Sequence, residues 1–206
     1  MNGRRTRNLA LLGLALALVL VGCAPAASRR AAPTVAVLNG PAEGRIAGSA
    51  ARLEADMRTQ GPLYFSFVSS AAMRFAEGHS DLFHDRAVTA AGRIARSYDA
   101  PYAVLIGASS LDRQVTVSKG KSARTVSVTL RIEAVVVDAA TNHVVARFDS
   151  PLCQQTRTES TADALPPLQQ DPTVQALRNE GVHDVAAAVV GALWHALGIH
   201  PSPRAP

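Results

Sequence analysis

The sequence predicts an α/β (α+β) fold, a single mixed β-sheet with an antiparallel strand meander and packed helices. Short apolar runs alternate with helical stripes in the first half, a strict period of two marks residues 125–136, and an apolar helical stripe follows near the end. Strands linked through a helix pair in parallel, whereas strands linked by tight turns pair antiparallel. The predicted order is therefore strand, helix, strand, helix, three strands, helix.

The elements of the first half are placed by their apolar spacing and by the breakers that end them. Thr34–Leu38 is a compact apolar run followed by Asn39-Gly40-Pro41, which is typical of a buried strand that meets a loop. A helical stripe follows and ends at Gly61-Pro62. In order, we expect a strand at 34–38, a helix around 46–57, a strand at 63–68, a short helix at 70–77 and a helix around 87–98.

The meander gives the clearest pattern. Tyr102–Ile106 is an apolar strand that runs on toward Ser118, and the turn that follows contains Gly120. The next strand buries one face, whose alternating apolar residues are Val126, Val128, Leu130, Ile132, Ala134 and Val136. A turn at Thr141-Asn142 leads to a strand at 144–148. Residues 102–149 are therefore predicted to form three antiparallel strands with long arms.

The C-terminal part is predicted as a connection and a helix. Pro151–Pro172 is polar and contains prolines, so we expect an irregular connection. The last helix is expected over Val182–Leu197 with Gly198 as its cap, and Asp184 would lie in its first turn, where negative charge is favourable. Gly191 inside this helix costs about 1 kcal/mol relative to alanine, which suggests close packing on the sheet.

The N-terminus is typical of an exported lipoprotein. Arginines at positions 4, 5 and 7 precede the apolar run Leu9–Val21, and Leu20-Val21-Gly22-Cys23 forms a lipobox. A helix of that length spans about 20 Å, short of the ~30 Å hydrocarbon core, so a signal peptide fits better than a transmembrane helix. We expect cleavage between Gly22 and Cys23 and acylation of Cys23, which would make membrane lipid a partner. The alternatives are an ordinary secretory signal with a chance cysteine, or a cytoplasmic tail anchor.

These signals divide the chain into four predicted segments. They are a lipoprotein signal peptide at 1–22, a lipidated N-terminus and tether at 23–33, a single α/β domain at 34–200 and a disordered tail at 201–206. Ala24 follows the cysteine at the place where a retention signal would have aspartate. In a two-membrane bacterium we therefore expect the periplasmic face of the outer membrane.

Charge and cysteine content narrow the class of partner. The net charge is +5, but removal of the three signal-peptide arginines leaves 18 basic against 16 acidic residues, a net charge of +2. Nucleic acid is therefore not expected as a partner. If Cys23 is acylated, Cys153 has no partner for an intramolecular disulfide. It is then a buried small hydrophobe or an intermolecular thiol, and the buried interpretation is favoured.

The sequence shows no catalytic constellation. Gly120-Lys121-Ser122 lacks the upstream glycine and the following helix of a phosphate-binding loop, and no Gly-x-Ser-x-Gly nucleophile turn is present. A candidate metal site consists of His79, Asp81, His84 and Asp85. Its spacing matches no recognised zinc pattern, and a solvated loop that caps the next helix is the simpler interpretation. We expect no enzymatic activity, no cofactor and no metal.

Three segments together resemble known families. They are the strand Thr34–Leu38, the helix end and strand Tyr98–Gly107, and the strand–turn–strand Val135–Val145. They are similar to the α/β domain shared by the curli secretion channel family, the penicillin-binding-protein activator LpoB, the flagellar protein FlgO and the N-terminal domain of TolB. Those families carry Ala-Asp-Tyr before the third strand and Asp-Ala-x-Thr-Gly at the turn, where this chain has Ala100-Pro101-Tyr102 and Thr141-Asn142. The resemblance implies a non-enzymatic, partner-binding module and does not choose among the families.

The hairpin between Leu111 and Val137 is the candidate docking surface. Its basic residues are Arg113, Lys119, Lys121 and Arg124. They would meet an envelope protein or peptidoglycan, or would guard a protruding strand edge. We therefore expect a lipid-anchored binding or assembly lipoprotein that acts by docking. The second arm also alternates over the roughly 9 to 11 residues of a membrane-spanning strand. The alternative function is thus an oligomeric outer-membrane secretion channel subunit of the curli-channel type.

Overall fold

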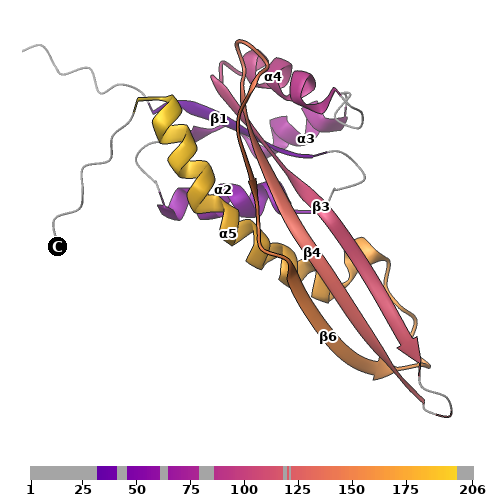
Figure 1. The fold of residues 1–206 in the computed structure, drawn as a ribbon. Helices are drawn as coiled ribbons and strands as arrows, with labels where there is room; N and C mark the ends of the chain where they lie inside the picture. The colour runs from indigo at the N-terminus through magenta and orange to yellow at the C-terminus, as the bar shows by residue number, and fades with distance from the viewer. Residues whose placement is uncertain are drawn as a thin grey trace, which may run out of the picture. The chain divides into compact units, whose positions relative to one another are not determined.

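The computed structural model describes residues 32–40, 46–60, 65–78, 86–117, 120 and 122–198. The chain divides between residues 31 and 32, and all of these residues belong to the second unit, Ala32–Pro206. In the described part of that unit, one six-stranded mixed sheet is packed between four α-helices (Figure 1). The predicted fold class is confirmed.

The elements follow one another in nearly the predicted order. They are β1 (Thr34–Asn39), α2 (Ser49–Gln60), β2 (Ser66–Phe67), α3 (Ser70–Gly78), α4 (Ala87–Ser97), β3 (Tyr102–Val117), β4 (Ala123–Asp138), β5 (Val144–Asp149), β6 (Cys153–Ser160), the 3-10 helix η2 (Leu168–Gln170) and α5 (Pro172–Ala196). The sheet order is β2-β1-β3-β4-β5, and β6 also pairs with β4. As predicted, β1 is parallel to β2 and β3, and β3, β4 and β5 form an antiparallel meander.

Two apolar layers hold the helices against opposite faces of the sheet. On β1, Val35 and Val37 belong to a core with α2 and α5, whereas Ala36 and Leu38 belong to a core with α3 and α4. All four side chains are buried, because β1 lies between β2 and β3 and is covered by helices on both faces.

Strand β4 is the central strand of the meander. The six apolar residues that alternate from Val126 to Val136 are all fully buried, as the period of two predicts. β3 pairs along the whole of β4, β5 pairs with residues 133–137, and β6 pairs with residues 123–130. Helix α5 packs on the apolar face, with Val174 and Leu177 in the same core.

The β4–β5 turn keeps its geometry without glycine. Asn142 adopts a φ of 57°, the left-handed conformation that asparagine tolerates. The Asp138 carboxylate accepts hydrogen bonds from the N–H groups of Thr141 at 2.9 Å and Ala140 at 2.8 Å. The Thr141 bond in particular holds the pKa of Asp138 below its ordinary value. Arg96 of α4 donates to Asn142 Oδ1 at 2.9 Å, so this turn is fixed from both sides.

The predicted irregular connection over Pro151–Pro172 is wrong. Cys153–Ser160 forms β6, and Leu168–Gln170 forms η2. Beyond Cys153, β6 carries polar side chains on both faces, so it lacks the apolar alternation that identifies a strand. The predicted strand at 63–68 is shorter, since β2 covers Ser66–Phe67 and residues 61–64 lie outside the described part.

Helix α5 begins ten residues before the predicted start at Val182. Its first residue is Pro172, and it ends at Ala196, followed by Gly198 at a φ of +64° as predicted for the cap. His183 and Asp184 therefore lie inside the helix, so Asp184 does not complement a first turn. No helix among the described residues is long and apolar enough to span a membrane.

The glycine that packs closely on the sheet is Gly181 instead of Gly191. A Cβ on Gly181 would lie 2.7 Å from Ile132 Cγ1 and 3.2 Å from Ser150 Oγ. A Cβ on Gly191 would meet nothing within 4 Å, and this residue is exposed. The close approach of α5 to β4 therefore depends on Gly181.

These two glycines give a matched test of the packing. Gly181→Ala should destabilise the domain, because an overpacking cost of about 1–3 kcal/mol exceeds the ~1 kcal/mol gained in helix propensity. Gly191→Ala should leave stability unchanged or raise it by up to about 1 kcal/mol. Chemical denaturation followed by far-UV circular dichroism measures both, and equal effects of the two substitutions would contradict the packing.

Candidate functional site

Three strands extend beyond the part of the sheet that α2, α3 and α4 cover (Figure 1). We call this region the strand tip and define it as Leu111–Val117 of β3, Ala123–Leu130 of β4 and all of β6. β4 lies in the middle, and its residues Arg124–Leu130 each have a partner on both sides, as in the row Val115, Val126 and Arg157. The strand tip is the candidate site, because it contains the predicted docking hairpin.

The two faces of the strand tip differ in chemistry. One face packs toward α5 and buries Val126, Val128 and Leu130 of β4. The other, which we call the open face, carries exposed or half-buried polar side chains: Asp112, Gln114, Thr116, Thr125, Ser127, Thr129, Gln154, Thr156 and Thr158. Ser127 Oγ accepts from Gln154 Nε2 at 3.3 Å and bonds with Thr156 Oγ1 at 3.2 Å. Hydroxyl and amide groups therefore dominate this face.

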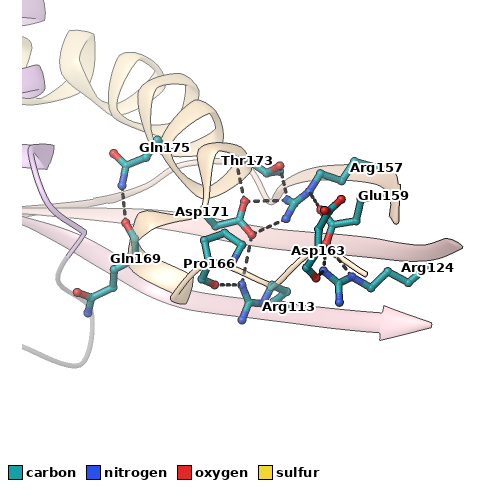
Figure 2. A network of polar contacts seen from close by, with 10 residues as sticks. All are labelled: Arg113, Arg124, Arg157, Glu159, Asp163, Pro166, Gln169, Asp171, Thr173 and Gln175. Atoms are coloured by element: carbon teal, nitrogen blue, oxygen red, sulfur yellow. Dashed lines mark hydrogen bonds and ion pairs between the residues drawn. The ribbon is translucent and has the colours of Figure 1, made fainter. Parts of the chain in front are cut away.

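A buried carboxylate joins the strand tip to the start of α5 (Figure 2). Asp171 is fully buried and caps the helix, accepting from Thr173 N–H at 2.9 Å through Oδ1. Arg157 of β6 binds the same carboxylate with both terminal nitrogens, Nη1 to Oδ1 at 2.7 Å and Nη2 to Oδ2 at 2.8 Å. Arg113 of β3 adds a contact from Nη1 to Oδ2 at 3.3 Å. The bidentate pair is geometrically the strongest form of this interaction.

The network continues across all three strands of the strand tip. Arg157 also donates through Nε to Glu159 Oε2 at 3.0 Å. Arg124 of β4 donates to Glu159 Oε1 at 2.8 Å and to the carbonyl oxygen of Asp163 at 2.6 Å (Figure 2). Arg113 donates to the carbonyl oxygen of Pro166 at 2.7 Å. The arginines thus fix the chain segment that returns from β6 to α5.

Hydrogen bonds within the network favour the charged forms of Asp171, Glu159 and Arg157. Burial works to raise the pKa of Asp171, but the bonds from Arg157 and from Thr173 N–H outweigh it, and the pKa lies below its ordinary value. The hydrogen bond from Arg157 lowers the pKa of Glu159, with help from Arg124. The hydrogen bond to Asp171 raises the pKa of Arg157 further.

The structure brings two of the predicted docking residues together and uses both inside the domain. The side chains of Arg113 and Arg124 are 19% and 11% exposed, and their guanidinium groups contact Asp171 and Glu159. Lys119 and Lys121, the other two, lie outside the described residues. The charge that the sequence places at the hairpin is therefore partly neutralised within the fold.

Several other predicted positions also lie outside the described part. They are the cleavage and lipidation residues Gly22 and Cys23 and the candidate metal ligands His79, Asp81, His84 and Asp85. Within the described residues, no group of three or more His, Cys, Asp and Glu side chains could hold a metal ion. Cys153 is buried, as predicted, and burial raises the pKa of its thiol.

The residues that sequence reasoning missed are Asp171, Arg157 and Glu159. Asp171-Pro172 does carry a signal, since aspartate is a preferred N-cap and proline is favoured at the first helical position. Arg157 and Glu159 carry none, because Asp171 and Arg124, which bind them, lie far away in the sequence and come close only in the folded chain.

A second polar cluster fixes the end of β1. Buried Glu77 of α3 accepts from Asn39 N–H at 2.7 Å, and Asn39 Oδ1 accepts from Ala50 N–H at 3.2 Å in the first turn of α2. A cavity of about 150 Å³ adjoins these groups, lined also by Met73 and Arg74. The cluster joins β1, α2 and α3 at one point.

No family model and no curated protein matches the sequence. Solved structures similar to the chain include the PelC dodecamer from Paraburkholderia phytofirmans, with 14% identity over 79% of this chain and 91% of that one and a TM-score of 0.33. Lipoprotein GNA1162 from Neisseria meningitidis has 10% identity over 82% and 99%, with a TM-score of 0.35. The LpoB C-terminal domain from Salmonella enterica has 15% identity over 60% and 83%, with a TM-score of 0.36.

LpoB is also one of the proteins that the sequence resembles, and GNA1162 is a lipoprotein. At identities of 15% or less and TM-scores below 0.4, the function of this chain has to be inferred from its own residues.

Asp171 provides the test of the network. Asp171→Asn should destabilise the domain by about 3–5 kcal/mol at neutral pH, because it removes the charge that Arg157 is paired with inside the fold. The pKa of Asp171 is lowered by folding, so its contribution is complete above its unfolded pKa of about 3.9 and is lost as pH falls through the lower folded-state pKa. The stability gap between wild type and variant should therefore narrow in strong acid.

Thermal unfolding as a function of pH measures this gap. Asp184→Ala is the matched control, because Asp184 is an exposed carboxylate on the same helix. Equal losses in the two variants at neutral pH would show that the network contributes nothing specific.

Proposed function

We propose that the chain is a cell-envelope lipoprotein, anchored through acylated Cys23, that acts by docking its strand tip to an envelope protein or to peptidoglycan. The lipobox Leu20–Cys23 supports the anchor, and the absence of a catalytic motif from the sequence supports binding as the activity. Ala24 after the cysteine favours the periplasmic face of the outer membrane in a two-membrane bacterium.

The direction of the strands is the observation that carries the proposal. The domain begins with β1, which is parallel to β3 with Val35 opposite Tyr102. β3 then continues from Tyr102 to Val117, a path of about 50 Å at roughly 3.3 Å per residue. The strand tip therefore lies at the end of the domain opposite to the point where the tether from Cys23 enters. A membrane-anchored chain would present this tip to partners away from the bilayer.

The bracing of the strand tip supports its use for docking. Asp171 and the arginines that contact it tie β3 and β6 to α5, and Arg124 ties β4 to β6 through Glu159, so the tip is held before any partner arrives. A pre-organised surface loses less conformational entropy on binding.

The burial of β4 favours docking over the channel alternative. The alternating apolar residues that make β4 a candidate membrane-spanning strand, Val126, Val128 and Leu130 among them, are fully buried in the core with α5. That face is therefore already used inside the domain and is not presented to lipid.

The anchor is tested by substitution of the lipidated cysteine. Cys23→Ala should release the protein from the membrane fraction, because the thiol that would carry the acyl chains is gone. Cys153→Ala is the control, since it removes the other cysteine and should leave the protein with the membranes. Fractionation and immunoblotting measure both, and retention of the Cys23→Ala chain would refute the anchor.

The docking surface is tested by a photo-crosslinking amino acid in living cells. Placed at Thr125, on the open face of β4, it should give a covalent adduct with an envelope component. Thr89 is the control position, because it is equally exposed but lies on α4. Mass spectrometry identifies the captured component, and adducts that form at Thr89 and fail to form at Thr125 would argue against docking through the strand tip.

A further inference from the structure

Both outer edges of the strand tip are unpaired among the described residues. β1 pairs with β3 only as far as Ile106, so Gly107–Val117 has β4 on one side and no strand on the other. β6 likewise pairs with β4 on one side alone. Each edge presents a row of backbone N–H and C=O groups that an extended strand can satisfy.

Within the strand tip, these edges lack the usual protection against strand pairing, since the register irregularity of β3 lies before the tip, between Ala108 and Ser110. Proline and lysine, the common guards of an exposed edge, occur neither in Gly107–Val117 nor in β6. The charged side chains of Arg113, Arg157 and Glu159 are drawn into the network with Asp171. Asp112 is the charged side chain that remains exposed on these two edges, and Val115 and Val117 are 41% and 57% exposed.

The two edges match each other in position and direction. β3 and β6 cover the same stretch of β4, since Leu111, Leu130 and Cys153 form one row and Val117, Arg124 and Glu159 another. Both strands are antiparallel to β4, so both run toward the end of the tip. Two copies that stand side by side in the same orientation therefore bring β3 of one next to β6 of the other as parallel strands.

We propose that the strand tip is a self-association surface, on which the outer edge of β3 pairs in parallel with the outer edge of β6 in a second copy of this chain. The common orientation of the copies rests on the proposed anchoring through Cys23, whereas the match of the edges does not. The contact is heterologous, so a pair of copies still has one free β3 edge and one free β6 edge for further neighbours. Pairing continues the hydroxyl- and amide-rich open face from copy to copy.

Mixed-disulfide formation in cells tests the pairing directly. Gln114→Cys and Thr156→Cys are made in separate, differently tagged full-length chains, which are expressed together and oxidised. Both positions are exposed on the open face, and neighbouring parallel strands bring Cα atoms within disulfide range. Combining Gln114→Cys with Gln154→Cys or with Thr158→Cys instead covers a register shift of two residues in either direction.

The expected result is a mixed dimer that forms at least tenfold more than either homodimer. Thr89→Cys combined with Thr156→Cys is the matched control and should form none, because Thr89 lies on α4. Homodimers of Gln114→Cys alone, or no mixed dimer of Gln114→Cys with any of the three β6 positions, would overturn the proposal.

Lysine substitutions on the β3 edge provide a second test of the pairing. Val115→Lys with Val117→Lys should convert the detergent-extracted full chain from a larger species to a monomer on a sizing column, whereas Thr89→Lys should not. Both valines are exposed, so folding should be preserved, and circular dichroism checks it. A monomeric unsubstituted chain, or a larger species that survives both lysines, would overturn the pairing. Failure of the anchoring proposal alone would appear separately, as membrane retention of the Cys23→Ala chain.

Discussion

The structure depends on the alternating apolar face of β4. Its six inward residues from Val126 to Val136 are fully buried, and β3, β5 and β6 all pair with this one strand. A shift of one residue in register would turn the whole set to the opposite face and expose it. The register is therefore fixed by burial, and the register in turn determines which residues of β3 and β6 lie level with each other. In particular, it places Arg157 and Arg113 near the buried carboxylate of Asp171.

Asp171 compensates for the limited apolar burial of the extended strands. Beyond the reach of α2, α3 and α4, the sheet has an apolar layer on one side only, so burial alone stabilises it less there. The carboxylate caps α5 and holds arginines from two strands, which adds charge-assisted bonds where apolar contacts are few. The cost is a buried charge that is stable only while its partners are present.

The parts of the fold that are defined by apolar burial could be predicted from the sequence, whereas the parts that depend on long-range polar contacts could not. The period of two in β4 and the turn at Asn142 depend on neighbours in sequence or on a single buried face, and both were predicted correctly. Strand β6 was missed because Gln154, Gln155 and Arg157 are polar whichever face they occupy. The early start of α5 was missed because Gly181 interrupts the apolar stripe, and its fit against Ile132 is a tertiary contact. Arg113 and Arg124 lie on β3 and β4 of the predicted hairpin, but their acidic partners come from segments far along the chain.

The ion pairs of Arg113 and Arg124 with acidic residues of the same chain determine how the strand tip could recognise a partner. Free cations would attract acidic partners over a distance and make binding depend on salt. Arg113 and Arg124 instead contact Asp171 and Glu159, and the described open face is formed mainly by threonine, serine and glutamine side chains. What remains for a partner is short-range: hydroxyl and amide groups, exposed valines and two rows of backbone donors and acceptors. In the proposed docking and self-pairing, specificity at this tip would therefore come from strand geometry, because an extended chain in the correct register satisfies all of these groups together.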